Sequence, residues 1–82
     1  MPLFFFNTAD GGRDSDREGT ELRDVAAARV EGIRFAGAAL SHDPDLLWDG
    51  RDFRVEVLDD RRMLLFTVIT LAVNAPAAEG VN

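Results

Sequence analysis

The chain has 82 residues, of which 46% are hydrophobic, and its formal net charge is −6 at pH 7. A chain of this length forms one domain at most, and its negative charge disfavours non-specific binding to nucleic acid or anionic membrane. It contains no cysteine, which excludes disulfides, thiolate zinc sites and cysteine nucleophiles and fits a cytoplasmic location.

Residues 3–8 predict a first strand, because they are rich in aromatic side chains and are followed by the turn residues at 9–12. Successive side chains of a strand point to opposite faces of the sheet. Phe4 and Phe6 should therefore face one side, and Leu3 and Phe5 the other. Since a small domain usually has one core, the pattern leaves one of these faces to be explained.

A helix is predicted after a polar stretch at residues 13–20, which is interpreted as a loop or a short exposed edge strand. Asp24 is the expected N-cap, and Pro44 should end the helix near Ser41 or His42. One stripe with spacings of four and three is expected to face the sheet, with its glycine allowing a close approach; it comprises Ala26, Val30, Ile33, Gly37 and Leu40.

The second half of the chain predicts a hairpin. An acidic connector at 43–52 is followed by residues 53–58, in which Phe53, Val55 and Val57 alternate with polar side chains. A tight polar connection at 59–62 leads to a last strand at 63–73. This last run is far shorter than the ~20 apolar residues of a membrane helix, so no membrane insertion is expected.

These elements predict an α+β fold in the order strand, strand, helix, strand, strand. A single helix should pack on a small, three- to four-stranded, mostly antiparallel sheet. Residues 1–73 are expected to form the domain, and residues 74–82 a flexible tail.

With this order in view, the chain resembles a family of short bacterial proteins known only as a domain of unknown function. The resemblance extends to about residue 71 and rests on an aromatic first strand, a D-x-x-G-x-E-L-x-D segment, an alanine-rich helix and a C-terminal hairpin. The matching segments here are LFFF from Leu3, DREGTELRD from Asp16, FRVEVLD from Phe53 and LFTV from Leu65. The hairpin turn departs from the family pattern, which usually has a glycine where this chain reads DDRR. The resemblance implies no activity.

The acidic segment at residues 10–24 raises the question of metal binding. Asp14, Asp16 and Glu18 alternate, and a glycine at the sixth position matches the start of an EF-hand loop. The twelfth position is Val25, however, where that loop requires a glutamate. These three carboxylates are therefore weak metal candidates, and no cofactor is expected.

Neither an enzyme nor a nucleic-acid-binding protein is indicated by the remaining polar residues. His42 is the single histidine and has no evident catalytic partner. Asp10, Asp14, Asp16 and Asp24 do not form a spacing that would hold magnesium for a nuclease. The arginines of the hairpin alternate with carboxylates, which cancels the basic field that a nucleic acid would need.

The apolar pattern carries the main functional expectation. One helix covers one face of a sheet, so apolar side chains on the other face need another cover. The interface candidates on that second face are Leu3, Phe5, Met63, Leu65, Ile69 and Leu71. Three covers stay open: the chain's own Trp48 segment or tail, a second copy of the chain, or a different protein.

The resulting hypothesis is a non-catalytic interaction module or small accessory subunit, possible as a homodimer, that uses the second face or the edge of its sheet. The alternative is a small metal- or ligand-binding protein that uses the acidic segment at 10–24.

Overall fold

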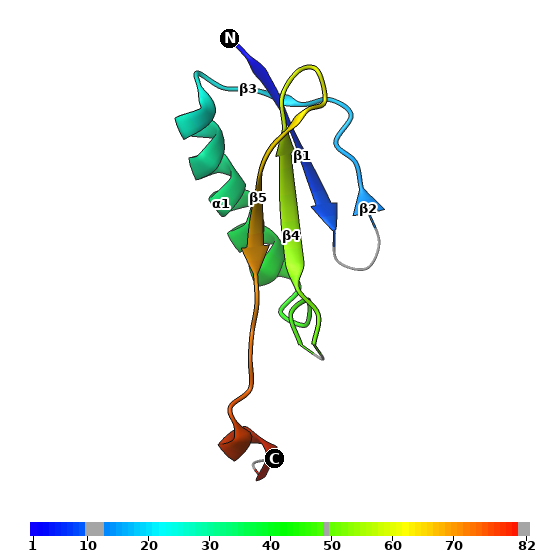
Figure 1. Cartoon of the computed structure of the whole chain (residues 1–82), viewed down its shortest axis with the longest axis vertical. Coiled ribbons are helices and arrows are strands. Elements are labelled where there is room, and N and C mark those ends of the chain that lie inside the picture. Colours follow the sequence, from blue (N-terminus) through cyan, green and yellow to red (C-terminus); the bar gives the residue numbers. More distant parts are fainter. Residues whose placement is uncertain (10–12, 49, 81–82) are drawn as a thin grey trace.

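The computed structural model describes residues 1–9, 13–48 and 50–80, with the side chains of 13 and 14 left aside (Figure 1). A helix lies against one face of a twisted antiparallel sheet. The elements in chain order are β1 (Leu3–Ala9), β2 (Arg13–Asp14), β3 (Thr20–Glu21), α1 (Val25–His42), β4 (Phe53–Leu58), β5 (Leu64–Thr70) and the short 3-10 helix η1 (Pro76–Gly80).

The sheet runs in the order β2-β1-β4-β5, and β3 pairs with the same edge of β1 as β2 does. All pairs are antiparallel, and Phe6 lies opposite Val57, which in turn lies opposite Phe66. The predicted α+β class with a single helix is confirmed. The uncertain second strand is present, but it is split into the two short strands β2 and β3.

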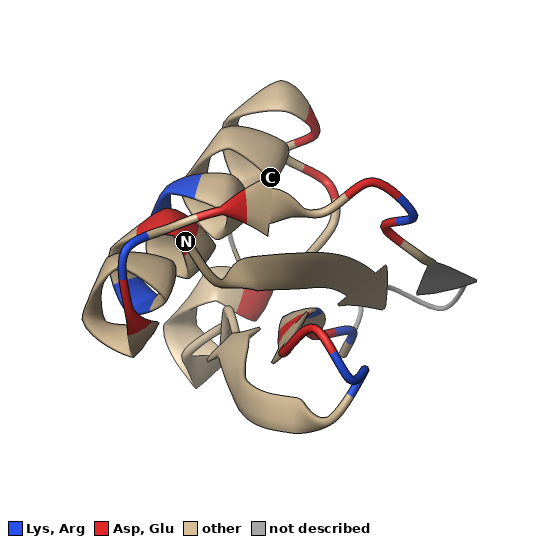
Figure 2. Ribbon diagram, turned by 90° about the horizontal axis from the view of Figure 1, so that it is seen from above, with Lys and Arg blue, Asp and Glu red and all other residues tan. Residues whose placement is uncertain are grey.

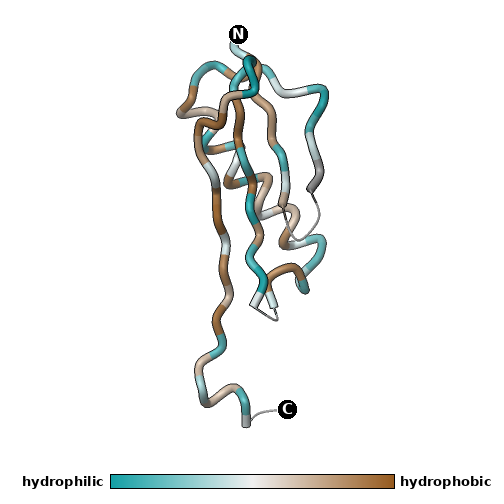
Figure 3. The backbone as a smooth tube through the Cα atoms, turned by 45° about the vertical axis from the view of Figure 1, so that its right-hand side comes forward, coloured by the Kyte–Doolittle hydropathy of each residue, from teal (hydrophilic) through white to brown (hydrophobic). Residues whose placement is uncertain are grey.

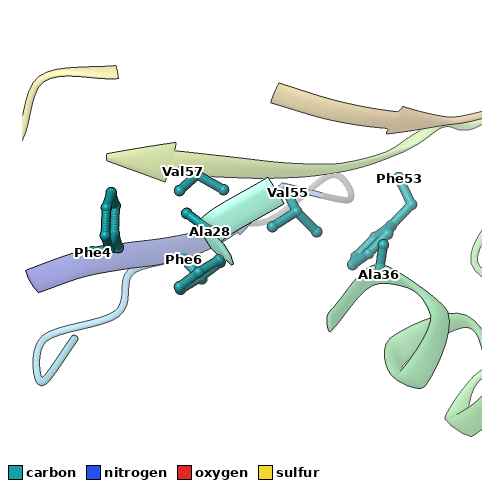
Figure 4. Close-up of a cluster of buried hydrophobic side chains, with 7 residues drawn as sticks. All are labelled: Phe4, Phe6, Ala28, Ala36, Phe53, Val55 and Val57. Atoms are coloured by element: carbon teal, nitrogen blue, oxygen red, sulfur yellow. The ribbon is translucent and has the colours of Figure 1, made fainter. Parts of the chain in front are cut away.

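The core lies between α1 and the helix-facing side of β1 and β4. The predicted alternation is confirmed, because Phe4 and Phe6 share this side with the three inward residues of β4. Figure 4 shows the buried cluster, whose members are Phe4, Phe6, Ala28, Ala36, Phe53, Val55 and Val57. Leu46 and Leu47 of the connector pack against this cluster, so the connector helps to close the core.

The helix has the predicted limits. Its N-cap is Asp24, whose Oδ1 accepts a hydrogen bond from the backbone N–H of Ala27 at 2.8 Å. At the other end, the backbone N–H of Asp43 donates to the carbonyl oxygen of Ala39 at 3.0 Å. The helix ends at His42, two residues before Pro44, as the steric restriction on the residue before proline requires.

The predicted buried stripe of the helix is wrong except at Leu40, which packs against the core. The residues that α1 buries are Ala28, Gly32 and Ala36, which follow one another at spacings of four. A Cβ at Gly32 would lie 3.4 Å from Cε2 of Phe66 and 3.5 Å from Cγ2 of Val68. Because these side chains are small or absent, the helix approaches the sheet closely, and the large side chains of the sheet fill the space between them.

The stripe that was expected to be buried is therefore largely exposed. Val30 retains 51% of its accessible surface and Ile33 retains 60%. Gly37, where the close approach was predicted, has no atom within 4 Å of the Cβ that it lacks. The small size of the alanine and glycine side chains decides which face of the helix packs on the sheet. Hydrophobicity alone would favour burial of the face with valine and isoleucine.

The C-terminal segment leaves the sheet earlier than predicted. β5 ends at Thr70, and residues 71–75 continue it in an extended line without strand pairing. Figure 1 shows this segment running away from the body of the molecule to η1, so that the two termini lie at opposite ends. The tail therefore does not cover the second face of the sheet.

Candidate interaction surface

The two edges of the sheet are built differently, and the β1 edge is the covered one. β2 pairs with its end, where Thr8 lies opposite Asp14, and β3 pairs with its start, where Leu3 lies opposite Glu21. Between these two short strands the chain departs from β1 over residues 15–19. The backbone groups in the middle of β1 need other partners there.

Asp16 supplies those partners. Its Oδ2 accepts a hydrogen bond from the backbone N–H of Phe6 at 3.2 Å, and its own N–H donates to Oδ1 of Asn7 at 2.8 Å. Its Oδ1 accepts from the N–H groups of Glu18 and Gly19 at 3.1 and 3.0 Å. One carboxylate oxygen thus takes the place of a ladder partner for Phe6, and the other fixes the turn between β2 and β3.

The same contacts change the acidity of Asp16. Burial by itself raises the pKa of this carboxyl. Hydrogen bonds from the N–H groups of Gly19, Phe6 and Glu18, with the charge of Arg62, outweigh burial and hold the pKa below its ordinary value of 3.8. The carboxylate is therefore committed to its structural contacts in the charged form.

Phe5 lies under this segment and is only 6% exposed. A Cβ at Gly19 would be 3.0 Å from Cε1 of Phe5 and 2.9 Å from Cγ of Leu3, so only glycine fits there. The Cζ atom of Arg62 lies 3.7 Å from the centroid of the Phe5 ring, and Nη1 of Arg62 donates to the carbonyl oxygen of Asp16 at 2.9 Å. The cover of Phe5 is thus the acidic segment and the hairpin turn, which were not among the three expected covers.

Arg62 reaches Phe5 because of the geometry of the β4–β5 turn. Oδ1 of Asp59 accepts from the backbone N–H groups of Arg61 and Met63, both at 2.9 Å. Arg62 itself has a φ of 64°, in the left-handed region that favours glycine. A non-glycine residue pays a conformational cost at this φ. The stacking of the Arg62 side chain on Phe5 offsets that cost.

The D-x-x-G-x-E-L-x-D segment is accounted for by these contacts. Asp16 pins the edge, Gly19 makes room for Phe5, and Asp24 caps the helix. The backbone N–H of Leu22 donates to the carbonyl oxygen of Pro2 at 3.0 Å, and its side chain packs against the core. The segment that first suggested metal binding therefore has a structural role at four of its positions.

The weak metal candidates do not meet in the part of the chain that the structure describes. Glu18 is exposed, the oxygens of Asp16 already accept three backbone hydrogen bonds, and the side chain of Asp14 is outside the description, as is Asp10. Among the described residues, no group of three or more histidine, aspartate or glutamate side chains is placed to hold a metal ion.

The β5 edge, unlike the β1 edge, is not covered by other described segments of the chain. Within the described residues, β5 pairs with β4 alone, and its outer edge carries no further strand. We define the β5 surface as four exposed apolar residues of this edge, Met63, Leu65, Ile69 and Leu71, which are 63%, 40%, 54% and 66% exposed. Ile69 lies on the second face, opposite Arg54, whereas Met63 and Leu71 flank the strand. A register shift at Leu58, which lies opposite Leu64, interrupts the simple alternation that was expected before Phe66. Figure 3 shows the hydrophobic colour running along this strand and into the tail.

The six predicted interface candidates thus separate into two groups. Leu3 and Phe5 are covered by their own chain, whereas the four residues of the β5 surface are accessible. Trp48, an expected cover, is 44% exposed, and its neighbours Leu46 and Leu47 pack on the helix side of the sheet. The part of the second face that belongs to β5 is left open.

A second exposed apolar feature borders the same edge. We call Val30 and Ile33 the α1 ridge. Gly32 faces β4 and β5, and Phe35, ~60° away around the helix, stacks on Phe6 of β1 with ring centroids 6.1 Å apart. Ile33 lies ~100° from Gly32 in the other direction and therefore on the β5 side, whereas Val30 lies ~160° from Gly32, on the outer side of the helix. Sequence reasoning missed the ridge because it assigned this stripe to the core.

Charge is absent from this region of the sequence. No Asp, Glu, Lys or Arg occurs between residues 63 and 78, although 29% of the whole chain is charged. Figure 2 shows the charged segments gathered along the helix and the connecting segments. The β5 edge also lacks the charged side chains and prolines that usually protect a free strand from pairing.

A surface cavity of about 520 Å³ lies on the other flank of the helix. Phe6, Phe35 and Phe53 form its apolar part, and Asp16, His42 and Asp43 lie at its rim with Ser15, Thr8, Ala39 and Leu46. It brings the acidic segment and the end of α1 together, which neither stretch of sequence predicts alone.

The comparisons identify the family. The model of the family described as a domain of unknown function, DUF6894, matches residues 3–72, and the chain belongs to this family. No curated protein and no solved structure matches the chain. In the described part of the chain, no helix is both long enough and apolar enough to cross a membrane.

Proposed function

We propose that the chain is a non-catalytic protein-interaction module, a small cytoplasmic accessory subunit that binds a protein through the β5 surface and the α1 ridge. The observation that carries this proposal is a free, uncharged edge strand with exposed apolar side chains on it and on the helix beside it. The cysteine-free composition fits a reducing compartment.

The size of the exposed apolar area supports this role. The β5 surface and the α1 ridge together expose roughly 600 Å² of mostly apolar surface, divided between the two sides of the sheet, which equals the largest single patch of a typical monomeric protein. Removal of such an area from water contributes on the order of 10 kcal/mol before the costs of association are subtracted. That is comparable with the whole stability of a small domain.

The test is recovery of the tagged chain from the cells in which it occurs, followed by native mass spectrometry. We expect the chain to carry a stoichiometric protein, either another copy or a different polypeptide, and the Ile69→Lys variant to lose it. Glu18→Gln, an exposed change on the opposite edge, is the matched control and should retain it. Recovery of the wild-type chain as a bare monomer would overturn the proposal.

A second candidate function is the binding of a small ligand in the cavity beside the acidic segment. Its three phenylalanines and the carboxylate of Asp43 suit an organic cation with an apolar body. Titration with alkylammonium salts, followed by NMR of the Phe35 ring, tests it. Shifts that saturate and that are lost in Asp43→Asn support the function, and unchanged spectra at millimolar ligand reject it.

A further inference from the structure

We propose that the protein bound at this surface is a second copy of the chain, with β5 of one copy pairing antiparallel with β5 of the other about a two-fold axis at Thr67. This inference rests on the proposed function, since it names the partner of the same surface. The pairing joins two sheets into one continuous sheet and buries both free edges.

The register follows from the sequence of β5. An axis at Thr67 places Leu65 opposite Ile69, the two residues of the β5 surface that lie within the strand, and brings Met63 near Leu71 just beyond its ends. Thr67 lies on the same face, because it pairs with Glu56 while Phe66 and Val68 point toward the helix. The two Thr67 hydroxyls then meet each other, a favourable cross-strand pair.

Neighbouring axes lack this complementarity. An axis at Val68 would place Thr67 opposite Ile69, and an axis at Phe66 would place Leu65 opposite Thr67. Each places a polar side chain directly across from an apolar one on the second face. The axis at Thr67 is the register in which the strand is complementary to itself, as an isologous interface requires.

Ile33 of the α1 ridge is the second feature that a copy would approach. The two-fold axis places both helices on the same side of the joined sheet, with their β5-facing flanks toward each other. Ile33 lies on that flank and is 60% exposed in the single chain. Val30 lies ~160° from Gly32, on the outer side of the helix, and stays outside this contact.

Charge and chain direction also suit a copy. The net charge of −6 makes two chains repel each other, but no charged residue lies in the paired strands themselves. In this register the turn at residues 59–62 of one copy lies beside residues 72–75 of the other, which are uncharged. The extended segment after β5 thereby gains a neighbour.

The area suits a dimer of moderate affinity. Edge pairing buries the backbone groups of the two strands and only part of the roughly 600 Å² of apolar side chain, so the interface falls below the ~800 Å² per partner of a standard interface. Because the like net charges of two copies are screened by salt, the dissociation constant should fall as ionic strength rises.

Single cysteines test the register, because the natural chain has none. Opposite residues of an antiparallel pair have Cα atoms about 4.5–5.5 Å apart, within disulfide range. Thr67→Cys should therefore form a disulfide-linked dimer under mild oxidation. Thr70→Cys on the same strand is the matched control: its two copies lie about 20 Å apart in this register and should stay unlinked.

A mixture sharpens the test, since Leu65→Cys should link to Ile69→Cys although neither links to itself. Sedimentation equilibrium of the wild-type chain gives the second measurement, with a dimer expected that Ile69→Lys dissociates. A monomer at 100 µM would overturn the inference, as would a dimer in which Thr67→Cys does not link and Ile69→Lys has no effect. If the purified chain is monomeric but a different protein is recovered with it from cells, the proposed function stands and only the inference fails.

Discussion

The two edge regions of the sheet differ in how the backbone and side chains of the outer strand are covered. At the β1 edge, Asp16, Gly19 and Arg62 hold a short acidic segment over Phe5, and Asp16 accepts a hydrogen bond from the backbone N–H of Phe6. At the β5 edge, within the described residues, nothing of the chain itself pairs with the strand. The comparison separates residues that serve the fold from residues that are available to a partner.

The difference teaches that polarity was the wrong guide to function in this chain. The polar side chains of the acidic segment make contacts within the chain, whereas the apolar residues of the β5 surface are exposed. Variants at the β1 edge should therefore change stability, and variants at the β5 edge should change association. Four predictions test this division.

The largest effect is expected at Gly19. An alanine there combines a φ of 74° with contacts of 2.9–3.0 Å to Leu3 and Phe5. Gly19→Ala should lower the free energy of unfolding by about 3 kcal/mol, measured by urea denaturation with Trp48 fluorescence. Gly50→Ala is the matched control, with a φ of 76° and open space around it, and should lose only about 1–2 kcal/mol. Equal losses would show that the Phe5 cover does not constrain the edge.

Asp16 comes next. Asp16→Asn should lower the free energy of unfolding by about 2 kcal/mol, because backbone N–H groups lose a charged acceptor. Since the folded pKa of Asp16 is lowered, its charge contributes stability above the ordinary value of 3.8, and this contribution is lost as the pH falls through the folded pKa. The difference between wild type and variant should thus shrink below about pH 4. A difference that does not change with pH would contradict the role of the charge.

Substitution of Arg62 should have a smaller effect on the free energy of unfolding, and two different substitutions there can be compared. Arg62→Ala should lose about 1 kcal/mol, because the stacking on Phe5 and the hydrogen bond to the carbonyl oxygen of Asp16 disappear. Arg62→Gly loses the same contacts but relaxes the backbone at a φ of 64°, so it should be nearly as stable as wild type. Thermal unfolding measures the stabilities of the two variants. If Arg62→Gly is less stable than Arg62→Ala, the backbone of the turn is not strained at Arg62.

The smallest effect on stability is expected at the β5 edge. Ile69 is 54% exposed, so Ile69→Lys should change the free energy of unfolding of the monomer by no more than about 0.5 kcal/mol. Its association should nevertheless be lost, as light scattering after size exclusion can show. A variant that unfolds the monomer would place Ile69 with the fold and remove the contrast between the two edges.

Much of this architecture is predictable from the sequence because it depends on local rules. The alternation in β4, the Asp24 cap and the stop before Pro44 follow from strand periodicity and helix-end chemistry. The orientation of α1 is not predictable in this way. It depends on whether Phe66 and Val68, far along the chain, leave room for Val30 or only for Gly32.

The candidate surface was likewise only half predictable. The β5 residues follow from counting apolar faces, which needs no contact information. The cover of Phe5 does not, because it combines a glycine at a positive φ, a carboxylate that takes the place of a ladder partner and an arginine from a turn 46 residues away from Asp16. Such a combination exists only once the chain is folded.

Hydrogen exchange at two protein concentrations tests the contrast between the edges most directly. If a second copy pairs with β5, the amides of residues 64–70 should become more protected as the concentration rises from about 1 to about 100 µM, whereas those of residues 3–9 should not change. Protection of β5 that is the same at both concentrations would contradict the account.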